Sequence, residues 1–235
     1  MMELVITVCL VCKTSLEKNN MYERNKKVKE KEEARLKELK KIDKDFFDRG
    51  IKYIAGIDEA GRGPLAGPVV VAAVIMKPDS MIEGINDSKK ISEKKREKLY
   101  DLILDEAISY GIGIVDQKEI DEINILQATK KGLTEAIKQM EIKPNVILVD
   151  ALNNIDTLKI PYQSIIKGDA KSYAIAAASI IAKVTRDRIM REWDNVYPQY
   201  GFASHKGYGT AKHILAIKEY GPCPLHRKSF IKNFI

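Results

Sequence analysis

The sequence has few cysteines, few histidines and few aromatic residues. Its 235 residues include three Cys, three His and one Trp, and aromatic residues make up 7%. Three cysteines are too few for a disulfide framework, so we expect a reducing, cytoplasmic setting. The histidines are far apart in the sequence, and this spacing does not indicate a metal site. The composition therefore favours neither a disulfide-stabilised protein nor a histidine-based metal protein.

The sequence also lacks a long hydrophobic run. Residues 4–12 are apolar, but the run is too short to span a bilayer and lacks the basic lead and cleavage site of a secretory signal. We therefore expect no membrane association. Cys9 and Cys12 have the spacing of a redox or zinc-binding pair, but no second pair or histidine lies near them, and we interpret the spacing as chance. Residues before Met21 are either a flexible leader or the result of an upstream start choice.

Basic residues are in excess, and the excess is uneven along the chain. The chain has 40 Lys and Arg against 33 Asp and Glu, which gives a formal net charge of +7. Residues 183–235 hold ten basic residues against four acidic ones. This asymmetry is the electrostatic footprint of a polyanion such as nucleic acid, although basic surfaces without a partner are also common. No pattern in the sequence requires more than a monomer.

We divide the chain into an N-terminal extension, residues 1–50, and a main domain, residues 51–235. Residues 21–50 are densely charged with both signs and carry a thin apolar stripe at helical spacing. This pattern predicts a charged helix that follows a flexible leader. The helix is either solvated and docked only through residues 39–47, or an accessory contact to nucleic acid; we favour the first interpretation.

The hydrophobic pattern of the main domain predicts an α/β fold. Residues 53–57, 69–76 and 110–115 are strand-like, and three consecutive strands predict an antiparallel meander. Residues 145–150 form a near-continuous apolar run, which is typical of a strand covered on both faces, and residues 162–166 form a fifth short β-type run. Helices are expected after Ser92, after residue 119 with Asn124 as the N-cap of its longer part, and from residue 173 onward, where small residues allow close packing on a sheet.

Asp58 and Glu59 end the first expected strand and precede a glycine-rich loop. Gly61, Gly63 and Gly67 lack a Cβ atom, so the loop can bring its backbone amides close to a ligand. Two adjacent carboxylates at the end of a buried strand repel each other, and such a pair persists mainly where a cation offsets the charge. Both can reach one metal site only if the strand ends or bends at Glu59, because successive strand side chains point to opposite faces. A solvated acidic turn is the alternative, and for an isolated pair it is the more common one.

Three further acidic residues lie at positions suited to a site. Asp150 ends the fully apolar strand, where α/β sheets place ligands, although a turn former is the more common role there. Asp169 lies just ahead of the helix that starts near residue 173, so helix capping is the alternative to metal binding. Asp187 is five helical turns further on, on the same face but about 27 Å along a straight helix. It has either a secondary role in positioning metal or substrate, or a surface ion pair with Arg186 or Arg188.

Two loops carry residues suited to nucleic acid. Residues 201–210 combine glycines with Lys206, which suits a phosphate contact, and Tyr208, which suits stacking on a sugar or base. Lys89 lies in an Asn-Asp-Ser-Lys-Lys run before the Ser92 helix. This run is either a phosphate-binding patch or an ordinary helix start, and the residues alone favour neither.

The chain from about residue 51 onward resembles the ribonuclease HII family. The resemblance rests first on Gly-Ile-Asp-Glu-Ala-Gly-Arg-Gly-Pro-Leu-Ala-Gly-Pro at residues 56–68, a long and highly specific match. It continues in Leu-Val-Asp at residues 148–150, in the stretch from Asp169 through residue 187, in His-Lys-Gly-Tyr-Gly-Thr at residues 205–210, and in residues 223–230. The Asn86 to Lys90 run also matches.

The resemblance implies a fold, a reaction and a set of roles. The fold would be ribonuclease-H-like, with a five-stranded mixed sheet flanked by helices and with C-terminal helices that bind substrate. The enzyme would be an endonuclease of class EC 3.1.26.4 that cuts the RNA strand of RNA–DNA hybrids and cuts 5′ of single ribonucleotides in duplex DNA. Its catalytic and metal-binding acids would be Asp58, Glu59, Asp150 and Asp169. Gly61, Arg62 and Gly63 would read the ribose 2′-hydroxyl, Lys89 would lie near phosphate, and Tyr208 would pack on the sugar beside the scissile nucleotide.

Acidic side chains alone form an all-oxygen site that suits Mg²⁺ or Mn²⁺ and not zinc, and two such ions would give 5′-phosphate and 3′-hydroxyl ends. Three rival functions are kept. Ribonuclease HIII carries lysine in the corresponding loop, so Arg62 and the following Pro-Leu-Ala-Gly-Pro argue against it. The other rivals are a ribonuclease-H-like nuclease that cuts only DNA and a nucleic-acid binder without catalysis.

Overall fold

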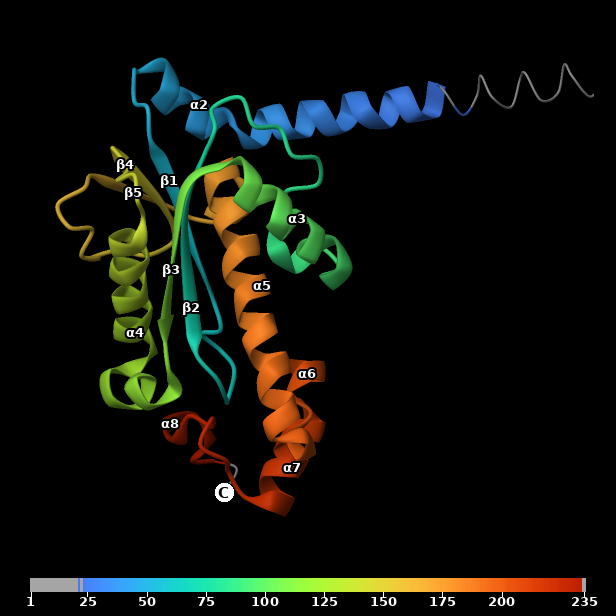
Figure 1. The fold of residues 1–235 in the computed structure, drawn as a ribbon, viewed down its shortest axis with the longest axis vertical. Coiled ribbons are helices and arrows are strands. Elements are labelled where there is room, and N and C mark those ends of the chain that lie inside the picture. The colour runs from blue at the N-terminus through green and yellow to red at the C-terminus, as the bar shows by residue number, and fades with distance from the viewer. Residues whose placement is uncertain (1–20, 22, 234–235) are drawn as a thin grey trace, which may run out of the picture.

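The computed structural model describes residues 21 and 23–233 and forms a central sheet with helices on both faces (Figure 1). Residues 4–12, with Cys9 and Cys12, lie outside the described residues. Residues 23–39 are helical. The elements that follow are α2 (Lys41–Asp48), β1 (Ile54–Ala60), β2 (Val69–Met76), η1 (Ser88–Lys90), α3 (Glu93–Glu106), β3 (Ala107–Val115), α4 (Gln117–Gln139), β4 (Val146–Asp150), β5 (Tyr162–Ile165), η2 (Gly168–Ala170), α5 (Tyr173–Val196), η3 (Pro198–Tyr200), α6 (Phe202–His205), α7 (Ala211–Tyr220) and α8 (Lys228–Ile231).

The sheet confirms the expected α/β fold. Its five strands run in the order β3-β2-β1-β4-β5. The pairs β1–β2 and β2–β3 are antiparallel, as the meander required, and β1–β4 and β4–β5 are parallel. Two strands are longer than the sequence pattern indicated: β1 extends through Asp58 and Glu59 to Ala60, and β3 already starts at Ala107.

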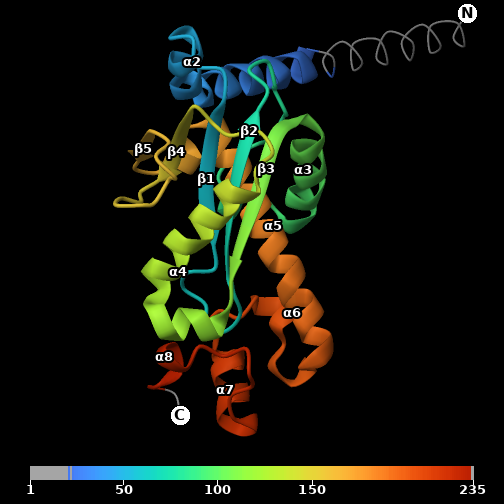
Figure 2. The same ribbon diagram turned by 60° about the vertical axis from the view of Figure 1, so that its left-hand side comes forward.

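Helices α4 and α5 cover opposite faces of the sheet (Figure 2). All eight residues of β2 are buried, and they alternate between the two cores. Val71 packs with residues of α4, whereas Ala72 packs with α5. A Cβ on Gly56 would lie 2.0 Å from the carbonyl carbon of Ala174, so α5 lies directly on the backbone of β1. The small residues of this helix therefore allow the close packing that the sequence predicted.

The helix caps agree in part with the sequence. Asn124 has φ 68° and interrupts α4, and its Oδ1 accepts hydrogen bonds from the backbone amides of Leu126 (3.0 Å) and Gln127 (3.1 Å). It caps the longer part of the helix, as expected. Ser92 occupies the N-cap position of α3, but its side chain makes no capping hydrogen bond. Among the described helices, none has both the length and the apolar character that crossing a bilayer requires.

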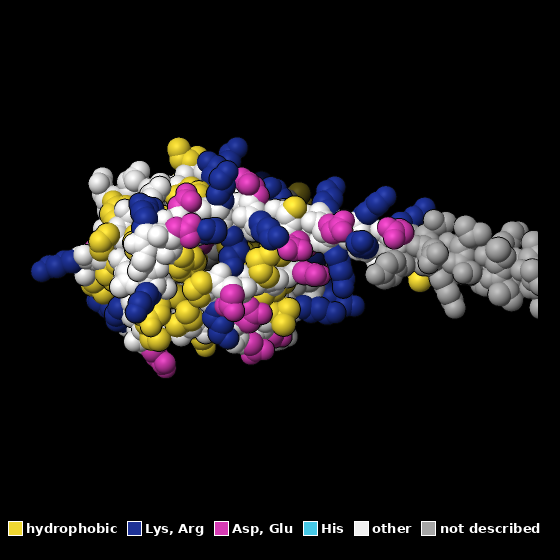
Figure 3. Space-filling view, turned by 90° about the horizontal axis from the view of Figure 1, so that it is seen from above, with side chains coloured by type: hydrophobic (Ala, Val, Ile, Leu, Met, Phe, Trp, Pro, Cys, Tyr) yellow, Lys and Arg dark blue, Asp and Glu magenta, His cyan; other side chains and the backbone are white. Residues whose placement is uncertain are grey.

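The extension docks more deeply than the favoured interpretation allowed. The helix of residues 23–39 projects from the domain and carries charges of both signs (Figure 3). Leu36 and Leu39 at its inner end are buried, and Phe46 of α2 joins a core cluster with strands β1 and β4. Asp43 is also buried and accepts hydrogen bonds from the start of α5. Leu36, Leu39 and Phe46 thus belong to the hydrophobic core of the main domain, and a division at residue 50 stays a prediction.

Candidate active site

Asp58 and Asp150 lie on neighbouring parallel strands at matching positions. The register pairs Ile57 with Val149, so the residues that follow them stand side by side where β4 ends. Asp58 is 8% exposed. Burial, followed by the negative charges of Glu59, Asp150 and Asp169, raises the pKa of Asp58 well above its usual value. The strand register therefore brings negatively charged side chains together at a buried position.

Strand β1 does not end at Glu59. Strand β1 continues to Ala60, so Asp58 and Glu59 are consecutive strand residues and point to opposite faces. Oε1 of Glu59 lies 3.3 Å from Nη1 of Arg62. Burial raises the pKa of Glu59, while the positive charge of Arg62 and its hydrogen bond oppose the shift. The charge of Glu59 nevertheless raises the pKa of Asp58, and the charge of Asp150 contributes to the raised pKa of Glu59, so the three carboxylates lie near one another.

A backbone contact brings Asp169 to the end of β4. The amide of Gly168 donates to Oδ1 of Asp150 at 2.8 Å, and Asp169 follows in η2. Burial, followed by the charges of Asp87 and Asp150, raises the pKa of Asp169. The N-cap of α5 is Ser172, whose hydroxyl accepts from the amide of Ile175, so Asp169 does not cap this helix.

Asp87 was missed in the sequence, although it lies in the run that contains Lys89. It caps η1 by accepting the amide of Lys89 at 2.9 Å, and its charge acts on Asp169. Lys89 is exposed and lies next to the acidic group. Burial alone would lower the pKa of its ammonium, but the charges of the acids, Asp58 and Asp169 first, raise it overall. Only the fold shows that this run borders the acids.

The acids fit a hard divalent cation by their chemistry, although they do not form a compact cage. Within residues 23–233, no three His, Cys, Asp or Glu side chains converge closely enough to hold a metal ion as they stand. The candidate site consists of carboxylates, whose oxygens are the donors that Mg²⁺ and Mn²⁺ prefer. The raised pKa values of Asp58, Glu59 and Asp169 show that burial and mutual repulsion destabilise their anions, which a divalent cation would relieve.

The glycine loop and Tyr208 face each other. Gly61 has φ +100°, a conformation that favours glycine, whereas Arg62 and Gly63 are exposed. A Cβ on Gly63 would lie 3.9 Å from Cε1 of Tyr208. Tyr208 is 44% exposed, and the cationic groups of Lys183 and Arg186 each lie 5.9 Å from the centroid of its ring. An open glycine backbone and an aromatic ring therefore border one space.

Two residues expected at the site are engaged elsewhere. Lys206 is 7% exposed, and its ammonium contacts the carbonyl of Ala203 and lies 3.6 Å from Oε1 of Glu93. Asp187 is buried and pairs with Lys183 at 2.7 Å and with Arg96 at 3.6 Å. Asp187 therefore does not form the surface ion pair with Arg186 or Arg188 that the alternative interpretation expected.

The basic C-terminal segment exposes less charge than its composition indicates. Arg186 and Arg227 are completely buried. Arg188 and Arg191 form ion pairs with Glu97, at 2.6 Å for Arg188. Several of the basic residues that were counted as evidence for a polyanion partner are therefore buried or ion-paired within the protein.

The three histidines, which are dispersed in the sequence, meet in the fold. The rings of His205 and His213 stack with centroids 4.4 Å apart, and Nε2 of His213 lies 3.0 Å from Nε2 of His226. Nδ1 of His213 lies 2.9 Å from the carbonyl of Tyr208. Burial lowers the pKa of His213 to about 4, so this is a neutral hydrogen-bonded group. Sequence spacing could not reveal it, because the contacts join different elements.

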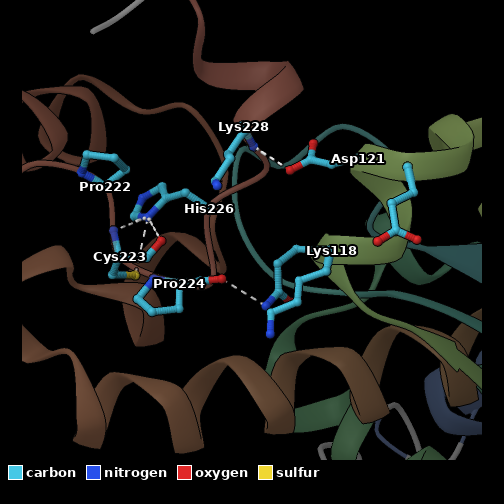
Figure 4. Close-up of a pocket in the computed structure, with 9 residues that line it drawn as sticks. Lys118, Asp121, Pro222, Cys223, Pro224, His226 and Lys228 are labelled. Carbon is cyan, nitrogen blue, oxygen red and sulfur yellow. Dashed lines mark hydrogen bonds between the residues drawn. The ribbon is translucent and has the colours of Figure 1, made fainter.

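A separate pocket of about 600 Å³ lies beside this group (Figure 4). It lies between the start of α4 and residues 222–228, and Cys223 and His226 line it together with Lys118 and Asp121. The backbone amide of Cys223 donates to Nδ1 of His226 at 3.0 Å. None of the four candidate acids lines this pocket, so we do not assign the reaction to it.

The fold places the chain among ribonuclease-H-like proteins. The crystal structure of ribonuclease H2 from Pyrococcus horikoshii OT3 superposes with a TM-score of 0.64 at 30% identity and covers 75% of this chain and 93% of that one. Bst-RNase HIII, solved in complex with Mn²⁺, has a TM-score of 0.55 at 18% identity and covers 72% of this chain and 63% of that one. This similarity shows a common fold and nothing more.

The family model for ribonuclease HII matches residues 55–233. Ribonuclease HII of Acetivibrio thermocellus is 61% identical over 91% of this chain and 83% of its own length. The chain belongs to the ribonuclease HII family. It is an endoribonuclease (EC 3.1.26.4), as the resemblance implied.

Proposed function

We propose that the protein hydrolyses the RNA strand of RNA–DNA hybrids and also cuts 5′ of single ribonucleotides embedded in duplex DNA. Family membership supports endonucleolytic cleavage of RNA in hybrids. The site assignment rests on one observation, the register of β1 and β4 that sets Asp58 beside Asp150. The charge of Asp169 acts on Asp58 as well, which supports a shared site.

Asp58, Glu59, Asp150 and Asp169 would hold two divalent ions, Mg²⁺ or Mn²⁺. When bound, such ions activate a water on one side of the phosphate and stabilise the leaving 3′ oxygen on the other. The expected products carry 5′-phosphate and 3′-hydroxyl ends. Asp150 already accepts the Gly168 amide, which fixes the distance between β4 and η2 and thereby the position of Asp169.

The glycine loop and Tyr208 would select the nucleotide. Backbone groups of Gly61 and Gly63 can approach the ribose 2′-hydroxyl, the group that distinguishes RNA from DNA, and Arg62 adds positive charge. Tyr208 would pack on the neighbouring sugar, since its exposed ring borders Gly63. The exposed Lys89 would contact phosphate beside the acids. A phosphate contact by Lys206 would require its ammonium to leave Glu93, and Asp187 keeps at most a secondary role.

The most informative test uses a DNA duplex with a single ribonucleotide, with an RNA–DNA hybrid and an all-DNA duplex of the same sequence beside it. With Mg²⁺ or Mn²⁺ we expect cleavage of the first two substrates only, because only they present a 2′-hydroxyl, and EDTA should abolish it. Product ends are identified by ligation and by phosphatase treatment.

The same assay separates the rivals. Cleavage of the all-DNA duplex would indicate a DNA nuclease, and binding without metal-dependent cleavage of any substrate would indicate a binding protein. Cleavage of the hybrid but not of the single ribonucleotide would restrict the activity to hybrids. We expect the enzyme to act as a monomer in the cytoplasm.

A further inference from the structure

Two arginines outside the acidic site are buried without a carboxylate partner. Arg186 of α5 and Arg227 near the C-terminus are each 0% exposed. Among the described residues, neither forms an ion pair with Asp or Glu within 4.0 Å. Burying an unpaired guanidinium is costly unless other groups satisfy its donors. Burial lowers the pKa values of Arg186 and Arg227 to about 10 and about 9, which reflects that cost.

Backbone carbonyls accept from both guanidinium groups, and all but one of these carbonyls belong to the glycine loop, residues 61–68. Arg227 donates from Nη2 to the carbonyl of Gly61 at 2.6 Å, from Nη1 to that of Arg62 at 3.0 Å, and from Nε and Nη2 to that of Gly67. Arg186 donates to the carbonyls of Pro68 (2.9 Å), Ala66 (3.1 Å) and Lys206 (2.9 Å). The two arginines therefore hold both ends of the loop.

The segment that carries Arg227 is fixed in turn. The backbone amide of Arg227 donates to the carbonyl of Leu65 at 2.8 Å. On the other side, Oδ2 of Asp121 accepts the amide of Lys228 at 2.7 Å, and Gln117 donates to the carbonyl of Pro224 at 2.9 Å (Figure 4). Arg227 is thus a support that connects the loop to the start of α4.

These contacts also determine which way the backbone amides of the loop point. In a trans peptide the carbonyl and the following N–H point in opposite directions. Because the carbonyls of Gly61 and Arg62 point inward to Arg227, the amides of Arg62 and Gly63 point away from it. Gly63 is exposed and borders the Tyr208 ring. The support therefore leaves these two amide donors on the side of the loop away from Arg227.

We propose that Arg227, assisted by Arg186, is a positioning residue for ribonucleotide selection, because it orients the Gly61–Arg62 and Arg62–Gly63 peptides so that their amides meet the 2′-hydroxyl. The inference rests on the proposed function, in which this loop reads the ribose. Lysine cannot replace arginine in this role, since an ammonium is a compact charge without the planar fork that reaches several carbonyls at once.

The test measures selectivity in binding, in an Asp58→Asn background that prevents cleavage, with Mg²⁺ present. The quantity is the ratio of the Kd for an all-DNA duplex to the Kd for the same duplex with one ribonucleotide. We expect Arg227→Lys to lower this ratio about tenfold, as the loss of one or two hydrogen bonds to the hydroxyl would. Affinity for the all-DNA duplex should stay close to that of the background. Arg191→Lys, which changes a partly exposed ion-paired arginine, is the matched control and should leave the ratio unchanged.

The outcomes separate the inference from the function beneath it. If the Asp58→Asn background itself binds both duplexes equally, the proposed ribose reading fails. If the background discriminates and Arg227→Lys discriminates equally well, only the role of Arg227 is overturned. Thermal unfolding checks that the variants fold. If Arg227→Lys does not fold, Arg186→Lys, which loosens the same loop from its Pro68 end, replaces it with the same expectation. Unfolding of both variants would overturn the inference, since the arginines would then serve stability and not selectivity.

Discussion

Tyr208 is the single side chain best placed to recognise the sugar next to the cut. Its ring is exposed and borders the backbone of Gly63. The backbone carbonyl of Tyr208 lies 2.9 Å from Nδ1 of His213. The hydrogen bond to His213 fixes the backbone that carries the ring, so the ring meets a ligand with little loss of conformational freedom. A preorganised aromatic surface of this kind favours stacking on a nucleotide.

We predict that Tyr208→Ala reduces kcat/KM on the single-ribonucleotide duplex about tenfold, because stacking contributes roughly 1–3 kcal/mol. Affinity for an RNA–DNA hybrid should fall less, since the remaining contacts to the duplex are unchanged. Tyr208→Phe keeps the ring and should retain most of the activity. Tyr110→Ala is the matched control, because Tyr110 on β3 is equally exposed at 44% but distant in the fold from the loop. Equal losses of junction cleavage and hybrid affinity would contradict the assignment of Tyr208.

The sequence identified residues within motifs but not residues that meet through folding. Asp58, Asp150 and Asp169 were proposed from strand ends, a helix start and the family resemblance, and these positions need only local information. Asp87 acts on Asp169 across the fold, and the contact of His213 with His226 joins α7 to the C-terminal segment. No spacing along the chain encodes such contacts. The burial of Arg227 was equally invisible, because a basic residue is exposed by default.

At the scale of elements, α2 and α5 are joined by one carboxylate. Asp43 of α2 accepts the backbone amides of Tyr173 and Ala174, each at 3.0 Å, and the hydroxyl of Ser172 at 3.1 Å. It therefore satisfies the free amides at the start of α5, which a helix N-terminus otherwise leaves unpaired. Since α5 begins shortly after Asp169, the extension helps to fix the part of the chain that carries this acid.

We predict that Asp43→Ala lowers the free energy of unfolding by about 1–3 kcal/mol, because buried amides would lose their acceptor. Urea unfolding followed by circular dichroism measures the change. Asp45→Ala removes an exposed carboxylate from the same helix and should change stability by less than about 0.5 kcal/mol. A result in which the two variants are equally stable would show that α2 docks independently of this cap.

Element types followed from the sequence more readily than element ends and docking. The period of the apolar residues predicted the five strands and the order of the meander, and Asn124 was identified as a cap because its side chain acts locally. The length of β1 depends on its pairing with β2, which continues to Ala60, and this pairing is not local. The burial of Leu36 depends in the same way on distant partners, so the thin apolar stripe of the extension understated its contacts.

At the scale of the whole molecule, the fold brings together acids that are far apart in the chain. Asp58 and Asp150 are separated by more than ninety residues and become neighbours through the parallel pairing of β1 with β4. The crossover between them contains β2, β3 and α4, and η2 then returns Asp169 to the same end of β4. The net charge of +7 acts at this scale too, but the burial of Arg186 and Arg227 means that composition overstates the exposed positive surface.

The account depends on these acids acting as one metal-dependent site, and Asp58→Asn tests this most directly. We measure kcat/KM on an RNA–DNA hybrid with Mn²⁺, together with the Kd for the hybrid, and use Asp101→Asn as an exposed carboxylate control. Asp58→Asn should lower kcat/KM at least about a hundredfold, the loss typical of removing one group that stabilises a transition state, while hybrid affinity persists. Asp101→Asn should behave as the unaltered protein does. Normal turnover by Asp58→Asn would contradict the central claim.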